Sequence, residues 1–196
     1  LEFCWKQAGQ RKGFRQLQGG CPGQREGARH AHQRHGERPD RGAAFNRHAQ
    51  RLAHGSDWAF TVFVVNDAND DDGMFAAGGS FPRAFSYAGG QFIVSPAKRP
   101  ASTFAHETGH MFWARDEYLG GGSYSDRRGY YNTQNTNAAD NPTPGFTQVN
   151  SIMTTGSLLD GAYNAHTSSV SSLEMIGWRD SDNDGVFDVL DEPNTL

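Results

Sequence analysis

Three segments rich in apolar residues, separated by polar and Gly-rich segments, predict three strands. Residues 59–65 form a nearly continuous apolar run rich in Val and Phe, which is typical of a buried central strand. A loop rich in Gly and Asp, residues 66–82, follows it. Residues 83–87 and 91–95 flank a short Ala-Gly-Gly segment, and they predict a hairpin or a pair of edge strands.

Apolar residues at helical spacing predict two helices in the first two-thirds of the chain. Phe45, Ala49 and Leu52 repeat at i, i+4 and i+7, which predicts a helix that ends at Gly55. A proline is well suited to the start of a helix, and a second helix is expected over residues 100–113.

The second half of the chain is dominated by a long polar loop. Residues 119–150 consist mostly of Gly, Asn, Ser, Thr and Pro, and loops of this length are usually functional. A last helix is predicted over residues 168–176, with Ser171 and Glu174 at capping-box spacing and Gly177 as its terminator. These elements predict an α+β fold.

Charge divides the 196-residue chain into two parts. Residues 1–55 carry a net charge of +7 and lack Val, Ile, Thr, Tyr and Met, whereas residues 56–196 carry −11. A segment without β-branched residues forms strands poorly and has little to bury. We therefore expect residues 1–40 to be a basic arm of low order and residues 41–196 to be the folded domain.

Three interpretations of this arm remain open. It is a pro-segment, a stretch of sequence read in the wrong frame, or a nucleic-acid-binding tail. The third is the least favoured because residues 16–40 have no aromatic residue among their arginines and the rest of the chain is acidic. No nucleic-acid partner is therefore expected. No apolar stretch is long enough for a membrane span.

The strongest chemical signal is the pentapeptide His-Glu-Thr-Gly-His at residues 106–110. On a helix, His106 and His110 would lie on one face, one turn apart. Two imidazoles placed in this way can bind one Zn²⁺, and Glu107 beside them can act on the zinc-bound water. Asp116 follows six residues after the second histidine, and a carboxylate oxygen is also a normal zinc ligand.

This arrangement resembles the metzincin clan of zinc peptidases, whose ligands come from the pattern H-E-x-x-H-x-x-G-x-x-H. It is most similar to the snapalysin-like variant, in which Asp occupies the last position. Residues 45–191 also look like bacterial secreted zinc peptidases with a late Asp-rich calcium loop. The resemblance implies zinc ligands His106, His110 and Asp116. It also implies a zincin fold, with a twisted mixed sheet packed on the zinc-binding helix and a loop-rich C-terminal half.

One position departs from the clan's pattern. Trp113 stands where the clan has a glycine in the left-handed conformation, which costs a bulky residue about 1–2 kcal/mol. Either the turn takes another shape, or the third ligand is Glu117 instead of Asp116. A more distant alternative is Glu174 on the last helix, as in thermolysin-like enzymes.

The resemblance also implies a tight turn beneath the metal that contains a methionine. The segment Asn-Ser-Ile-Met-Thr at residues 150–154 has the order expected for this turn, which makes Met153 the candidate. A methionine in a loop is, by itself, more often part of the core packing.

The C-terminal residues 180–191 have the spacing of an EF-hand-type calcium loop. The candidate oxygen ligands are Asp180, Asp182, Asp184, the backbone carbonyl of Val186, Asp188 and Asp191. Asp191 stands where such loops usually have a bidentate Glu, so we expect a weak site. The alternative is an acidic Asp-Gly turn without an ion.

The expected function is that of a zinc-dependent endopeptidase with a zinc-activated water and Glu107 as general base. Its partner would be a protein or peptide substrate, held by strand addition at the edge strand near residues 91–95. The alternatives are a zinc hydrolase of a non-peptide amide and a calcium-dependent binding or adhesion module with a vestigial zinc site. We expect Zn²⁺ and Ca²⁺ as cofactors, a monomer, and secretion, since a weak calcium loop fills only at extracellular concentrations.

Overall fold

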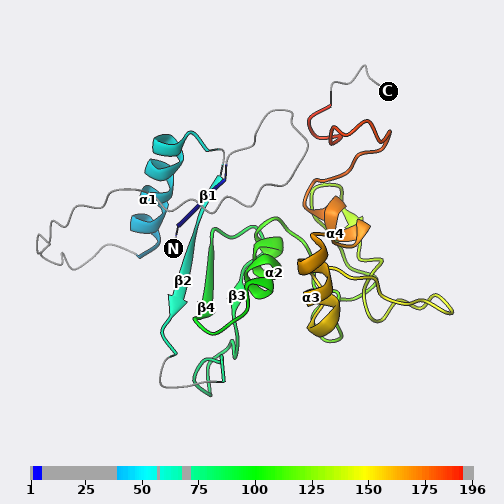
Figure 1. The fold of residues 1–196 in the computed structure, drawn as a ribbon, viewed down its shortest axis with the longest axis horizontal. Helices are drawn as coiled ribbons and strands as arrows, with labels where there is room; N and C mark the ends of the chain where they lie inside the picture. The colour runs from blue at the N-terminus through cyan, green and yellow to red at the C-terminus, as the bar shows by residue number, and fades with distance from the viewer. Residues whose placement is uncertain (1, 6–38, 57, 68–71, 192–196) are drawn as a thin grey trace, which may run out of the picture. The chain divides into compact units, whose positions relative to one another are not determined.

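The computed structural model describes residues 2–5, 39–56, 58–67 and 72–191, and its contacts divide the chain into two units (Figure 1). The N-terminal unit, Glu2–Phe60, contains β1 (Glu2–Trp5), α1 (Pro39–His54) and the start of β2 (Trp58–Val65). The C-terminal unit begins at Thr61 and contains all later elements. This division falls within β2, between Phe60 and Thr61.

The helix that was predicted to end at Gly55 is present as α1. It ends at His54, and Gly55 follows with a φ of 55°, a left-handed conformation that favours glycine. The Ser56 N–H donates to the carbonyl of Arg51 at 3.0 Å and closes the helix end.

The sheet of the C-terminal unit is mixed. β2 pairs in parallel with β4 (Phe92–Pro96), and β3 (Phe85–Ser86) pairs antiparallel with β4, as the predicted hairpin requires. β4 therefore lies between β2 and β3. The prediction that residues 91–95 form an edge strand is wrong, because the parallel partner β2 covers the side of β4 that a simple hairpin would leave open.

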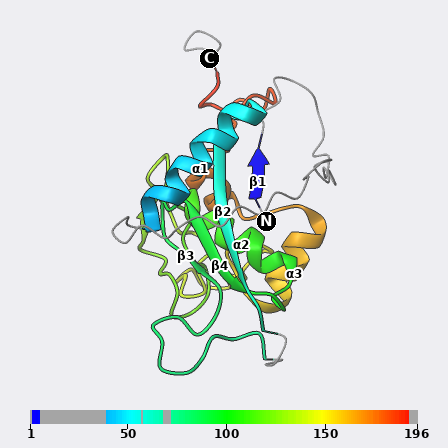
Figure 2. The same cartoon turned by 90° about the vertical axis from the view of Figure 1, so that its left-hand side faces the viewer.

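One face of this sheet is covered by α2 (Ala101–Met111), which lies beside β3 and β4 (Figure 2). Along β4, Ile93 and Ser95 are buried while Phe92 and Val94 are partly exposed. The expectation of a buried strand over residues 59–65 holds only for Val62, which pairs with Ile93. The next three residues of β2 are exposed.

Two further helices follow the long polar segment. α3 (Gly156–Ala165) packs against α2 and was not predicted from the sequence. α4 (Val170–Met175) matches the predicted last helix, but its cap differs. The Ser169 hydroxyl accepts from the backbone N–H of Ser172 at 3.1 Å, so the predicted capping box at Ser171 is wrong. The N-cap is therefore Ser169, two residues before Ser171.

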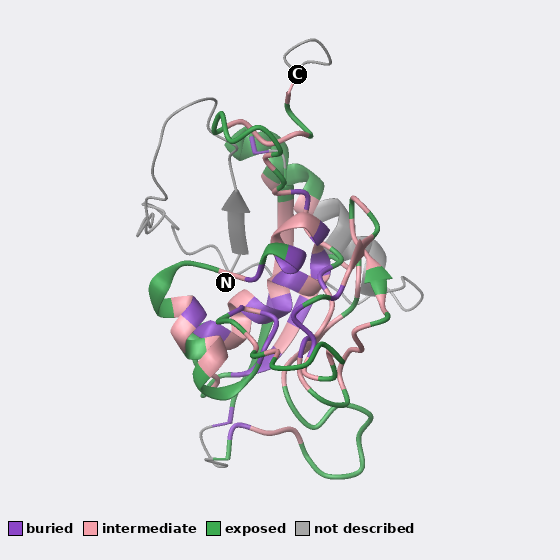
Figure 3. Ribbon diagram, turned by 90° about the vertical axis from the view of Figure 1, so that its right-hand side faces the viewer, coloured by how far each residue is buried: buried purple, intermediate pink, exposed green. Residues whose placement is uncertain are grey.

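The predicted loop over residues 119–150 contains a second, two-stranded sheet, formed by β5 (Arg127–Arg128) and β6 (Thr133–Gln134). The buried residues of the C-terminal unit, purple in Figure 3, include both apolar and polar ones. Its largest fully buried side chains include Ile93, Met153, Met175, Glu117 and Asn135. The fold is thus mixed α+β, with small sheets and four helices in the described chain. None of these helices combines the length and apolar character needed to cross a bilayer.

Candidate metal centre

α2 carries the two histidines of the pentapeptide on one face. Pro100, in extended conformation, precedes the helix. His106 and His110 lie one turn apart, with ring centroids 4.9 Å apart and ring planes nearly perpendicular. Since their spacing is i and i+4, regular helix geometry alone brings both imidazoles to the same side.

The turn after α2 brings Asp116 back to the histidines. Trp113 adopts a φ of 72°, and its N–H donates to the carbonyl of His110 at 2.9 Å. The alternative that Trp113 forces a different turn shape is therefore wrong, since the residue takes the left-handed conformation. Its indole packs over Gly89, where any Cβ would overlap the ring. This packing offsets part of the left-handed cost of about 1–2 kcal/mol.

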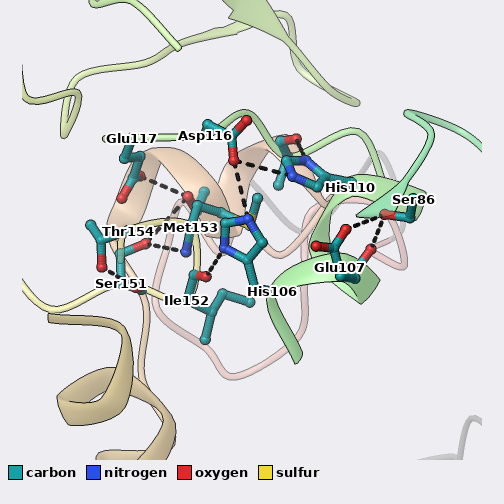
Figure 4. Close-up of polar contacts among 12 residues, drawn as sticks. Ser86, His106, Glu107, His110, Asp116, Glu117, Ser151, Ile152, Met153 and Thr154 are labelled. Atoms are coloured by element: carbon teal, nitrogen blue, oxygen red, sulfur yellow. Dashed lines mark hydrogen bonds and ion pairs between the residues drawn. The ribbon is translucent and has the colours of Figure 1, made fainter. Parts of the chain in front are cut away.

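Three ligand atoms converge at the end of this turn (Figure 4). The Oδ1 atom of Asp116 lies 3.1 Å from Nε2 of His106 and 3.1 Å from Nε2 of His110. Ligands about 2.0–2.1 Å from a tetrahedral zinc ion lie about 3.3–3.4 Å from one another. The spacing of these atoms is therefore close to that of a zinc site.

Asp116 Oδ1 is buried and accepts no hydrogen bond from the described residues. The Nε2 atoms of His106 and His110 are its electrostatic neighbours. A buried carboxylate oxygen without a donor is costly. A cation placed between the three atoms would satisfy it, so these residues fit a metal ion.

The outer nitrogens of both rings are held by backbone carbonyls. His106 Nδ1 lies 2.7 Å from the carbonyl oxygen of Ile152, and His110 Nδ1 lies 3.0 Å from that of Ala114. A carbonyl can only accept, so both Nδ1 atoms carry a proton and donate it. In this tautomer Nε2 of each ring holds the lone pair that a metal ion would take, which is the usual support for a metal-binding histidine.

The electrostatics of the site couple its charges. Burial raises the pKa of Asp116, but the two imidazoles outweigh it and hold that pKa well below its usual range. Burial lowers the pKa of His110, while Asp116 and the carbonyl of Ala114 together raise it above the ordinary value. Asp116 therefore stays ionised at neutral pH and is available as an anionic ligand.

Glu107 lies on α2 directly after His106. It is 6% exposed, and its Oε2 accepts a hydrogen bond from the Ser86 hydroxyl at 2.9 Å (Figure 4). Ser86 is on β3, far from the pentapeptide in sequence. No local sequence signal identified it as part of the site.

Tyr118 also lies at the site and was missed. Its ring centroid is 6.1 Å from that of His106. Burial, followed by the charge of Asp116, raises the pKa of Tyr118 to about 12, so the phenol stays protonated. Its position two residues after Asp116 was the one available signal.

The two alternative third ligands have other partners. The Glu117 side chain is fully buried, and its carboxylate accepts from Asn137, Ser169 and Ser172. The Glu174 carboxylate accepts from the Thr133 hydroxyl at 3.1 Å. Neither belongs to the group formed by His106, His110 and Asp116.

Met153 lies in a tight turn beneath α2. The Thr154 N–H donates to the carbonyl of Ser151 at 3.1 Å, and Met153 is fully buried. Its sulfur lies so close to Gly109 that a Cβ there would overlap it. The Met153 carbonyl accepts from the backbone N–H of Glu117 at 2.9 Å, so the turn and the segment carrying Asp116 are directly joined.

The C-terminal loop brings together three of its predicted ligands. Carboxylate oxygens of Asp180, Asp182 and Asp184 lie within 4.8 Å of one another. Asp188 is not in this group, since its carboxylate accepts from the N–H and hydroxyl of Ser181, both at 2.7 Å.

The described chain contains two groups of three or more potential metal-binding side chains. One is formed by His106, His110 and Asp116, and the other lies in this loop. The comparisons with known proteins add no relative. No protein-family model, curated protein or solved structure is significantly similar to the chain, so its function is inferred from the residues and geometry of these two sites.

Proposed function

We propose that this chain is a zinc-dependent endopeptidase of metzincin type. The observation that carries the proposal is the convergence of two Nε2 atoms on the buried, unpartnered Oδ1 of Asp116. Two imidazoles and one carboxylate suit zinc better than calcium or magnesium, which prefer oxygen ligands throughout. Three protein ligands leave the fourth position free, as a catalytic zinc site needs.

When bound, zinc lowers the pKa of a coordinated water toward ~7 and polarises the substrate carbonyl. The Glu107 carboxylate then accepts one proton as water oxygen bonds to the carbonyl carbon. The same proton passes from Glu107 to the nitrogen of the leaving amine as the C–N bond breaks. Tyr118, protonated beside Asp116, supplies a hydrogen-bond donor at the site.

The edge of the sheet supports an extended peptide as substrate. β3 has β4 on one side, and no further described strand pairs with its other side. A peptide backbone can add to such an edge as a strand. Because Ser86 on this strand contacts Glu107, the edge lies next to the general base. A small non-peptide amide would not need this edge.

We also propose that the loop at residues 180–191 binds calcium. Asp180 Oδ1 is buried without a hydrogen-bond donor, and it lies in the group with Asp182 and Asp184. Oxygen ligands of this kind suit calcium. This loop favours the second candidate function, a calcium-dependent binding module. A weak site would fill outside the cell, which supports secretion.

Metal content measured by mass spectrometry tests both sites in the full chain. The parent should carry one zinc per chain and hydrolyse casein. Asp116→Ala should lose zinc and keep calcium, whereas Asp182→Ala should weaken calcium and keep zinc, so each variant is the control for the other. Glu107→Gln should keep zinc and lose casein hydrolysis.

Two results would contradict the peptidase proposal. If Asp116→Ala retained zinc at the parent's affinity, Asp116 would not be the third zinc ligand. A folded parent that binds calcium, but neither zinc nor casein, would favour the binding module.

A further inference from the structure

We propose that Ser86 is a positioning residue for Glu107. This inference rests on the proposed function, because it assigns Ser86 to the general base of that reaction. Ser86 lies on β3, whereas Glu107 lies on α2, so the contact joins the hairpin to the zinc-binding helix.

The Ser86 hydroxyl shares its single proton between two acceptors of Glu107. Its Oγ lies 2.9 Å from Oε2 of the carboxylate and 2.7 Å from the backbone carbonyl oxygen of the same residue (Figure 4). A glutamate side chain has three rotatable bonds, so a contact to both its backbone and its far end restricts it strongly. The hydroxyl therefore fixes the direction in which the carboxylate points.

The contact with Ser86 makes the two carboxylate oxygens of Glu107 unequal. Among the described residues, Oε2 has Ser86 as its partner, and Oε1 has no hydrogen-bond donor. Oε1 is therefore the oxygen available for proton transfer. A general base must lie within about 2.6–3.2 Å of the proton it takes, so fixing one oxygen places the other.

A second pair of contacts holds the hairpin in register with the helix. Gly89 donates its N–H to the carbonyl of His110 at 3.2 Å, and the Trp113 indole covers Gly89. Ser86 and Gly89 are three residues apart, as are Glu107 and His110. The hairpin and the helix therefore meet at two matched points, which keeps Ser86 opposite Glu107.

The test compares Ser86→Ala with Ser86→Thr in the full chain loaded with zinc. Misplacing a general base costs roughly 10–100-fold in rate, so Ser86→Ala should lower kcat by about tenfold or more. Its KM and its zinc affinity, measured with a competing chelator, should stay within about twofold of the parent. Ser86→Thr keeps the hydroxyl and suits a strand, so it should restore most of kcat.

Ser95→Ala is the matched control. Ser95 lies on the neighbouring strand, and its hydroxyl bonds to the carbonyl of Pro96 and not to the site. This variant should keep the parent kcat. A second readout is the unfolding midpoint of the metal-free chain. Ser86→Ala should lower this midpoint less in the Glu107→Ala background than in the parent.

The outcomes separate this inference from the proposed function. Parent kcat in Ser86→Ala, with Glu107→Gln inactive, overturns the role of Ser86 and leaves the peptidase intact. Loss of zinc or of folding in both Ser86 variants means a structural role and also overturns it. Full activity in Glu107→Gln overturns the proposed mechanism itself, whatever Ser86 does.

Discussion

Asp116 and Glu117 are adjacent carboxylates whose surroundings give them different tasks. Oδ1 of Asp116 faces two imidazole nitrogens, whereas the carboxylate of Glu117 is hydrogen-bonded on both oxygens. The sequence left both open as the third ligand, because either residue follows His110 at a workable spacing. The donors that occupy Glu117 lie 20 to 55 positions further along the chain, where no local pattern could reveal them.

At this scale, Glu117→Gln should destabilise the metal-free chain by about 1–3 kcal/mol. The Oε2 atom accepts from Nδ2 of Asn137 at 2.7 Å, and an amide nitrogen there would face another donor. Asn137 cannot flip without loss, because its Oδ1 accepts from the N–H of Val149 at 2.9 Å. If Gln instead placed its nitrogen at the position of Glu117 Oε1, the hydroxyls of Ser169 and Ser172, which donate there, would have to turn and accept.

Denaturant unfolding measures this loss of stability, and Glu174→Gln is the control. The Glu174 carboxylate accepts from a single hydroxyl and lies at a polar cavity of about 410 Å³, so its variant should lose less than about 0.5 kcal/mol. Equal unfolding midpoints for Glu117→Gln and the parent would contradict the structural role of the Glu117 carboxylate as a buried hydrogen-bond acceptor.

At the scale of elements, the local signals predicted α2, the β3–β4 hairpin and the position of α4. Each of these depends on residues close in sequence, such as Pro100 before α2 and the Gly-Gly pair between the strands. α3 was missed because it contains glycines at its start and in its middle. Gly161 is needed there because a Cβ would lie 2.7 Å from the side chain of Asn150. Such a contact comes from tertiary packing, which the sequence alone does not display.

The interior position of β4 was missed for the same reason. Its parallel pairing with β2 joins segments about thirty residues apart. The hairpin signal concerns β3 and β4 only, and it leaves open which strand faces a third one.

The contact between α2 and the turn at Met153 gives a prediction for these two elements. Gly109→Ala should destabilise the chain by about 1–3 kcal/mol, although Ala favours helix formation by roughly 1 kcal/mol. The reason is that the new Cβ would overlap the Met153 sulfur, which is fully buried. Thermal unfolding of the metal-free variant measures the loss, and a chelator competition should show weaker zinc binding because Ile152 supports His106 from this turn.

The double variant Gly109→Ala, Met153→Ala is its control. Removing the long side chain leaves room for the new methyl group, so the double variant should lose less stability than the two single variants added together. Strict additivity would mean that Gly109 and Met153 do not press on each other.

At the scale of the whole molecule, the C-terminal unit has a modest apolar core. Its fully buried large side chains comprise Ile93, Met153 and Met175 together with polar residues such as Glu117 and Asn135. Small cores are commonly supplemented by metal ions, whose binding energy adds directly to the folding energy. The two metal sites proposed for this unit would then both stabilise it, and the zinc site would also serve catalysis.

Calcium should therefore stabilise the full chain independently of zinc. With zinc removed by a chelator, calcium at 100 times its dissociation constant should add about 2.7 kcal/mol and raise the unfolding temperature. The gain follows from binding to the folded loop, where three carboxylates already lie together and Asp180 Oδ1 lacks a donor. Asp182→Ala should lose most of this gain in stability. Asp116→Ala should keep the gain, because Asp116 belongs to the proposed zinc site and not to the calcium loop. An equal rise with magnesium, or a rise that survives in Asp182→Ala, would mean that the loop is an acidic turn and that the cation acts by screening charge.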